Sequence, residues 1–167
     1  MYQKEKNYAF IDGQNLNLGI KSLGWNLDFR RFRIYLKQKY KVTVAYYFIG
    51  YMSENQVLYS ALQKYGYNLI FKPIVTDAAG EMKGNVDADL VLQAMLDYKN
   101  YDKAIIVSSD GDFYSLVKYL YKTNKLERVM SPYIKTCSIL LKKTAKEKIL
   151  FMGNLRRKLE YKKKNTA

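Results

Sequence analysis

The chain contains no histidine, one cysteine and two prolines among its 167 residues. The absence of histidine excludes Ser-His-Asp and Cys-His catalysis, histidine acid/base ribonuclease chemistry and histidine metal sites. A single cysteine, Cys137, excludes an internal disulfide and a thiolate-clustered zinc site, and we expect it to be a buried small hydrophobe. An enzyme of this composition would have to rely on carboxylates and a hard cation.

Long apolar runs are also missing from the sequence. No segment approaches the roughly 18 residues that a membrane span requires, and residues 1–6 lack the apolar segment of a signal peptide. The sequence therefore predicts a cytoplasmic protein with no membrane association. Its length and its 49% of hydrophobic residues predict one folded domain over residues 1–161, followed by a basic, frayed tail over residues 162–167.

Acidic residues are scarce relative to basic ones. The 15 Asp and Glu residues against 29 Lys and Arg give a formal net charge of +14, which attracts polyanions and makes such binding sensitive to salt. Nucleic acid is the obvious partner class. The alternative is compositional, because Lys, Tyr, Asn and Ile are all abundant here, as an A+T-rich coding sequence would produce.

Short apolar runs of strand length alternate with amphipathic runs of helix length along the chain. The predicted strands cover residues 8–11, 42–49, 68–75, 104–107 and 126–130, and Pro73 indicates an edge position for the third. A capping box at Ser53 and Gln56 predicts the start of one helix, and Asp112 is the expected N-cap of another over residues 113–122. Residues 76–85, rich in glycine and polar residues, are expected to form a mobile loop near the site. The alternation predicts an α/β fold with a central, mostly parallel sheet.

Two of the predicted strands release aspartates where they end. Asp12 follows residues 8–11, and Asp110 and Asp112 follow residues 104–107. If the first strand is central and the fourth lies beside it, Asp12 and Asp110 emerge together at the carboxyl edge of the sheet, where open α/β sheets bind ligands. The alternative is that these aspartates are only capping and turn residues.

A third acid comes from the helix that begins near Asp87. The helical period places Asp87 on the inward face with Leu90 and Val91, whereas Asp89 is offset by about 200° and is expected to be a first-turn acid stabilised by the helix dipole. Clustered carboxylates raise one another's pKa, and a bound divalent cation is the simplest way to stabilise their ionised forms. Ligands that are all oxygen favour Mg²⁺ or Mn²⁺. An acidic metal cleft in a basic protein suits phosphodiester hydrolysis.

Three segments of the chain resemble the signatures of the NYN domain family, specifically its bacterial LabA-like branch. They are residues 8–15 (YAFIDGQN), 83–87 (KGNVD) and 107–113 (VSSDGDF), and the likeness in order and spacing runs from about Tyr8 to Tyr161. Family members more often carry Ser-Gly-Asp where this chain has Ser108-Ser109-Asp110. The resemblance implies a three-layer α/β/α, PIN-like (Rossmann-like) domain related to the 5′-nuclease superfamily.

The resemblance also implies a function and its residues. It assigns Asp12, Asp87, Asp110 and Asp112 to a Mg²⁺ or Mn²⁺ site and gives Asn15 the role of orienting the first aspartate or a bound water. The implied activity is endoribonuclease cleavage of single-stranded RNA, leaving a 5′-phosphate and a 3′-hydroxyl. The alternatives are a nucleic-acid-binding or regulatory adaptor module with a vestigial metal site, or a related nuclease of DNA or tRNA.

Two further features are left open by the sequence. Trp25, Tyr51 and Tyr133 are candidate stacking partners for bases, against the alternative that each is packed within the fold. Dimerisation through the basic carboxyl-terminal segment would give a homodimer, and nothing in the sequence decides for or against it.

Overall fold

Two buried strands form the middle of the molecule. All four residues of β6 (Ala104–Val107) are buried, and so are the last four of β1 (Asn7–Asp12). Strands of this kind need cover on both faces, which a parallel sheet between two layers of helices provides. The computed structural model describes residues 4–83 and 85–164 of the chain.

The sheet has six strands in the order β3-β2-β1-β6-β7-β8, and every neighbouring pair is parallel. The other strands of this sheet are β2 (Val42–Gly50), β3 (Tyr67–Lys72), β7 (Leu126–Ser131) and β8 (Ile149–Phe151). The predicted α/β fold with a central parallel sheet is therefore confirmed. Strand order reverses between β1 and β6, and ligands bind at such switch points in open α/β sheets.

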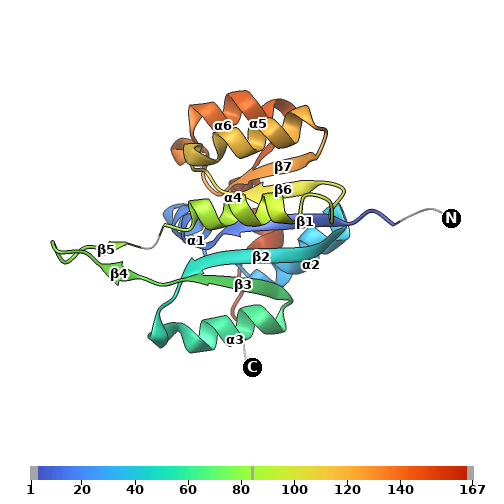
Figure 1. Ribbon diagram of the computed structural model, residues 1–167. Helices are drawn as coiled ribbons and strands as arrows, with labels where there is room; N and C mark the ends of the chain where they lie inside the picture. Colours follow the sequence, from blue (N-terminus) through green and yellow to red (C-terminus); the bar gives the residue numbers. More distant parts are fainter. Residues whose placement is uncertain (1–3, 84, 165–167) are drawn as a thin grey trace.

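Helices cover both faces of the sheet and complete three layers (Figure 1). One layer packs its buried residues with one face of the sheet and contains α1 (Gly13–Ser22), α2 (Phe29–Tyr40), α3 (Gln56–Lys64) and α7 (Arg156–Leu159). The opposite layer contains α4 (Asp87–Leu96), α5 (Tyr114–Lys122) and α6 (Ile139–Ala145). Short 3-10 helices lie at η1 (Ser53–Asn55), η2 (Gly111–Phe113), η3 (Ile134–Thr136), η4 (Lys146–Lys148) and η5 (Met152–Leu155).

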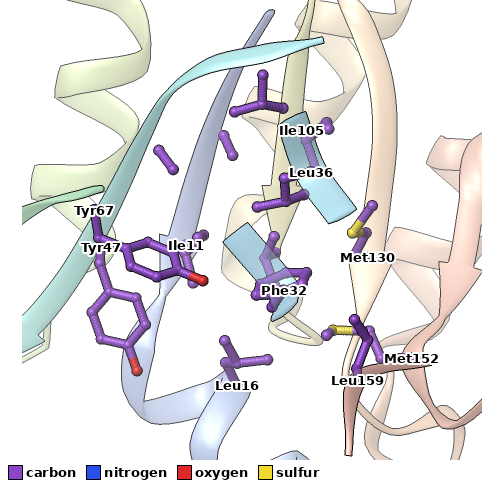
Figure 2. Packing of buried hydrophobic residues seen from close by; sticks show 14 of the residues in the cluster. Ile11, Leu16, Phe32, Leu36, Tyr47, Tyr67, Ile105, Met130, Met152 and Leu159 are labelled. Carbon is purple, nitrogen blue, oxygen red and sulfur yellow. The ribbon is translucent and has the colours of Figure 1, made fainter. Parts of the chain in front are cut away.

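Alternation along the central strands divides the core into two clusters. Ile11 and Ile105 face the layer that contains Phe32 and Leu36 of α2, as Figure 2 shows. Phe10 and Ile106 face the opposite layer, and Cys137 is buried in that second cluster, as the sequence predicted. Burying each large side chain contributes about 1.5–3 kcal/mol, so the sheet centre is the rigid part of the scaffold on which the strand ends are held.

The segment after β3 differs from the sequence prediction. β3 ends at Lys72, just before Pro73, and lies at the sheet edge as expected. The predicted loop over residues 76–85 instead contains an antiparallel hairpin of β4 (Val75–Thr76) and β5 (Met82–Lys83). The hairpin projects from the body of the molecule (Figure 1). Composition suggested a loop because the paired strands are only two residues long.

Two predicted helix starts are also wrong in detail. Neither Met52, before η1, nor Asn55, before α3, makes a side-chain capping bond, so the capping box predicted at Ser53 does not form. At the other elbow Asp110, and not Asp112, accepts the capping hydrogen bond, which comes from the Asp112 backbone N–H. A one-turn 3-10 helix precedes each of these two α-helices, α3 and α5, and displaces the cap from the position that the sequence suggests.

The carboxyl-terminal segment is tied to the loop before α2. The Asp28 N–H donates to the Leu159 carbonyl at 2.8 Å, and the Tyr161 N–H donates to the Asn26 carbonyl at 2.8 Å. Residues 1–3, Gly84 of the second motif and residues 165–167 of the predicted basic tail lie outside the described residues. Among the described residues, no helix has the length and apolar character needed to cross a bilayer.

Candidate metal centre

Asp12 is the last residue of β1 and the N-cap of α1, which fixes its carboxylate at the carboxyl edge of the sheet. Its Oδ1 accepts a hydrogen bond from the Asn15 N–H at 3.2 Å, and its Oδ2 accepts one from the Ser108 hydroxyl at 3.2 Å. The residue is only 6% exposed. Asp12 is therefore a nearly buried carboxylate whose orientation is set by Asn15 in α1 and by Ser108 just after β6.

Asp110 lies beyond the end of β6, beside Asp12. Its backbone N–H donates to the Ser108 hydroxyl at 3.1 Å, and the same hydroxyl donates to Asp12. Asn15 adds a second link between the two strand ends, because its Oδ1 accepts a hydrogen bond from the Ser109 N–H at 2.8 Å. The parallel pairing of Ile11 with Val107 brings the strand ends together, and these bonds fix them in register.

Asp87 is the first residue of α4, whose amino end approaches the same edge. Its backbone N–H donates to the Asn85 side-chain oxygen at 2.8 Å. The Oδ2 atom of Asp87 is buried and has no hydrogen-bond partner among the described residues. A buried carboxylate oxygen without a donor is costly, so this atom needs a cation, a proton or water to be satisfied.

The three carboxylates converge on one point. Asp12, Asp87 and Asp110 each offer one oxygen, and these oxygens all lie within 4.8 Å of one another. No described Lys or Arg side chain forms an ion pair with any of the three. The sequence predicted this convergence from strand order and helical period, and the structure brings the three side chains together.

The environment of the cluster disfavours negative charge. Burial raises the pKa of Asp12 from 3.8 to about 6, the charges of Asp87 and Asp110 add to the rise, and the hydrogen bonds from Asn15 and Ser108 oppose it. Burial also raises the pKa of Asp87, against the hydrogen bond with Asn85 and together with the charges of Asp110 and Asp112. A divalent cation would relieve both effects, because it supplies the opposing charge that the protein lacks here.

The donor set fits a hard cation. All three side chains supply carboxylate oxygens, the chain has no histidine, and its one cysteine is buried in the core. Oxygen-only ligands select Mg²⁺ or Mn²⁺ over softer metals, and the unpartnered Asp87 oxygen gives such an ion a ligand that nothing else satisfies. The residues present therefore fit the cation that the sequence predicted.

The remaining acids lie in different environments. Asp112 is exposed and is not one of the three convergent carboxylates, although its charge reaches Asp87 and raises the pKa of that residue. Asp89 points elsewhere, because its Oδ2 pairs with the Lys72 Nζ at 3.3 Å. The inward position of Asp87 and the outward position of Asp89 follow the helical period of α4.

A cleft of about 570 Å³ opens from the cluster. Besides the three carboxylates, its lining includes Asn15, Gln14, Met82 and Thr136. Met82 belongs to the projecting hairpin and Thr136 to η3, and sequence reasoning identified neither because both depend on how distant loops fold over the edge. Ser108 was not assigned a role in the site from the sequence, although its place in the motif before Asp110 was a signal for its bond with Asp12.

The three aromatic residues weighed as stacking partners differ in exposure. Trp25 is buried in the core at 4% exposure, so of the two alternatives weighed for it the structure shows packing within the fold. Tyr51 is 45% exposed, and its ring also contacts Tyr59 and Phe71. Tyr133 is half-buried immediately before η3.

Comparisons with known proteins agree with this geometry. The family model described as the NYN domain matches residues 7–149. A 121-residue stretch is 26% identical to the low amplitude and bright protein LabA of Synechococcus elongatus, covering 66% of this chain and 65% of that protein. A crystal structure of a protein of unknown function from Vibrio parahaemolyticus superposes with a TM-score of 0.76 at 24% identity, covering 91% of this chain and 95% of the other. This last likeness concerns the fold alone.

Proposed function

Because the chain belongs to the NYN domain family, as its three motifs predicted, we propose that it is a divalent-metal-dependent endoribonuclease acting on single-stranded RNA. The NYN domain lies within the PIN-like nuclease superfamily, and the acidic cluster is present here. The observation that carries the proposal is the convergence of Asp12, Asp87 and Asp110 around a buried, unpartnered carboxylate oxygen.

Each residue of the site has a proposed role. Asp12, Asp87 and Asp110 hold the cation, and Asp112 adds negative charge beside Asp87. Asn15 and Ser108 are positioning residues, because their hydrogen bonds fix the ends of β1 and β6 relative to each other. A Mg²⁺ or Mn²⁺ ion bound there supplies a Lewis acid that activates water and stabilises the leaving oxygen of a phosphodiester. Cleavage is expected to leave a 5′-phosphate and a 3′-hydroxyl.

The net charge of the chain supports a polyanionic substrate. With +14 overall, the protein attracts a phosphate backbone, while the three carboxylates occupy one notch at the sheet edge. An acidic notch alone would repel a phosphate, so a cation at the cluster, together with the net positive charge of the chain, is needed to bring RNA to it.

The first prediction concerns activity. Purified protein is expected to cleave a single-stranded oligoribonucleotide in the presence of Mn²⁺ or Mg²⁺, and EDTA should stop the cleavage. The Asp110→Asn variant should cleave at least about a hundredfold more slowly than wild type. Cleavage is measured on end-labelled RNA, and Mn²⁺ binding is measured separately by electron paramagnetic resonance. DNA of the same sequence tests whether the 2′-hydroxyl is required.

The same helix offers a matched control. Asp89→Asn removes an equal charge two residues from Asp87, yet Asp89 pairs with Lys72 and lies outside the cluster, so its activity should stay within about twofold of wild type. Equal cleavage by Asp110→Asn and wild type would overturn the proposed site. RNA binding without cleavage, with no bound Mn²⁺, would favour the alternative of a binding or regulatory module.

A further inference from the structure

A second cleft lies beside the acidic one. It has a volume of about 450 Å³ and lies between α1, the end of β2, and the η1–α3 segment. Gln14 and Met82 line both clefts, so the two are neighbours at the amino end of α1. A strand bound at the carboxylates therefore has the second cleft next to it.

The lining of the second cleft combines an apolar part with a polar one. Phe29, Ile49 and Leu58 are half-buried and supply the apolar part. Gln14, Asn17 and Asn55 supply the polar part, and their side chains form no hydrogen bond among the described residues. Carboxamides both donate and accept hydrogen bonds, and a ring or aliphatic surface beside them suits a flat heterocycle.

Lys21 adds a positive charge to this cleft. It lies in the last turn of α1, is exposed, and lines the second cleft but not the acidic one. Apolar surface, amides that make no hydrogen bond within the described residues and one cation together match a nucleotide, with its base in the second cleft and its phosphate toward the lysine. An apolar ligand would displace water from these amides and the lysine without replacing its hydrogen bonds, which disfavours that occupant.

We propose that the second cleft holds one unpaired nucleobase of the RNA, next to the nucleotide whose phosphate lies at the carboxylates. This subsite rests on the proposed ribonuclease function and goes beyond it, because it explains why the substrate must be single-stranded. A base in a duplex is stacked and paired and cannot enter a hollow in the protein, whereas an unpaired base can be turned into it. Asn17 and Asn55 are its specificity-determining residues.

The experiment uses a set of single-stranded oligoribonucleotides of one sequence, each with one abasic ribose at a successive position. In wild type, an abasic ribose at one position next to the cleaved bond is expected to lower kcat/KM by about tenfold, since base contacts of this kind are worth about 1–3 kcal/mol. In the double variant Asn17→Ala/Asn55→Ala, the intact RNA should be slower and the abasic penalty at that position should disappear. Gln63→Ala, an exposed amide on α3 outside both clefts, is the matched control and should keep the full penalty.

Binding of the same oligonucleotides, measured by fluorescence anisotropy in Ca²⁺, tests the subsite independently of cleavage, and so separates this proposal from the proposed function. Cleavage by wild type with the same penalty in the double variant, or with no sensitive position, would overturn the subsite and leave the nuclease standing. Absence of cleavage would overturn the nuclease, and the subsite would then stand or fall on whether the abasic penalty in binding is lost in the double variant. Circular dichroism of each variant checks that the fold is intact.

Discussion

At the scale of single residues, Asp12 lies in an environment that disfavours its ionisation. Both of its oxygens accept hydrogen bonds, from Asn15 and Ser108, yet burial and two neighbouring carboxylates still raise its pKa to about 6. A residue needed only for capping α1 would gain nothing from this burial. The arrangement is favourable when a cation balances the charge, which is why we assign Asp12 to the metal site.

The raised pKa of Asp12 predicts how stability depends on pH in the metal-free protein. A folded-state pKa above the unfolded value of 3.8 means that the folded protein binds more protons between about pH 4 and pH 6. Stability from this residue is therefore present below pH 4 and is lost as the pH rises through 6. A pKa difference of about two units corresponds to about 3 kcal/mol. In EDTA, Asp12→Asn should be more stable than wild type by about this amount at pH 7 and equal to it below pH 4.

Urea unfolding of both proteins across this pH range measures the difference. Titrating groups that do not interact with Asp12 are the same in the two proteins and cancel, so the comparison measures Asp12 together with its coupling to Asp87 and Asp110. Saturating Mn²⁺ at pH 7 should stabilise wild type and not the variant, because a ligand that binds only the folded state adds to its stability. A variant that is less stable than wild type at every pH would show that Asp12 acts as a structural cap and contradict the prediction.

At the scale of elements, the sequence predicted the scaffold better than its connections. The five main strands were identified because buried parallel strands are short, apolar and rich in β-branched residues. The alternation with helices predicted a parallel sheet, and the observed order has the first strand central with the fourth beside it, as was supposed. Helix α1 was not identified from the sequence, because Gly13 and Asn15 have weak helix propensity and the helix depends on the burial of Leu16 and Ile20 under the sheet and on the Asp12 cap.

The acidic cluster was predictable and its cleft was not. Asp12, Asp87 and Asp110 could be placed together because each lies at an element end whose position follows from topology and helical period. The cleft also depends on Met82 in the short hairpin and on Thr136 in η3. The hairpin pairs only two residues on each side, which is too short for the alternating pattern by which a strand is identified.

The close packing of α1 against β2 predicts an effect of one methyl group. A Cβ added at Gly13 would lie 2.5 Å from the Tyr47 ring and 2.8 Å from the Phe48 carbonyl oxygen, closer than packed atoms allow. We expect Gly13→Ala to lower the free energy of unfolding by about 1–3 kcal/mol, as overpacked cores do, and to weaken Mn²⁺ binding by moving Asp12. Urea unfolding and Mn²⁺ titration measure the two effects.

Gly153→Ala is the control for this substitution. Its added Cβ would make only ordinary contacts with Leu23, at 3.5 Å and beyond, so its stability should stay within about 0.5 kcal/mol of wild type. If Gly13→Ala were as stable as wild type and bound Mn²⁺ equally well, the close packing of α1 against β2 would not be what positions the Asp12 carboxylate.

At the scale of the whole molecule, we propose separate roles for the acidic and the basic residues. The acids that converge at the sheet edge are the proposed ligands of a cation, and the excess of basic residues over the rest of the chain gives it a net charge of +14. Net charge of this size acts on association with polyanions and says little about the fold. Whether it serves RNA binding or only reflects composition is decided by how binding responds to salt.

The last prediction is that RNA binding weakens steeply with ionic strength. Neutralising Z phosphates of a single strand gives a slope of about −0.7Z in log affinity against log salt, so four contacts would lower affinity about fiftyfold between 50 and 200 mM. Fluorescence anisotropy with Asp110→Asn and a single-stranded 12-mer measures binding without cleavage. A strand of the same bases on an uncharged backbone is the control, and its affinity should be weak and nearly independent of salt, because no counterions are released from it. A flat response for both strands would mean that the basic surface does not contact phosphates, and the charge would then be a property of composition alone.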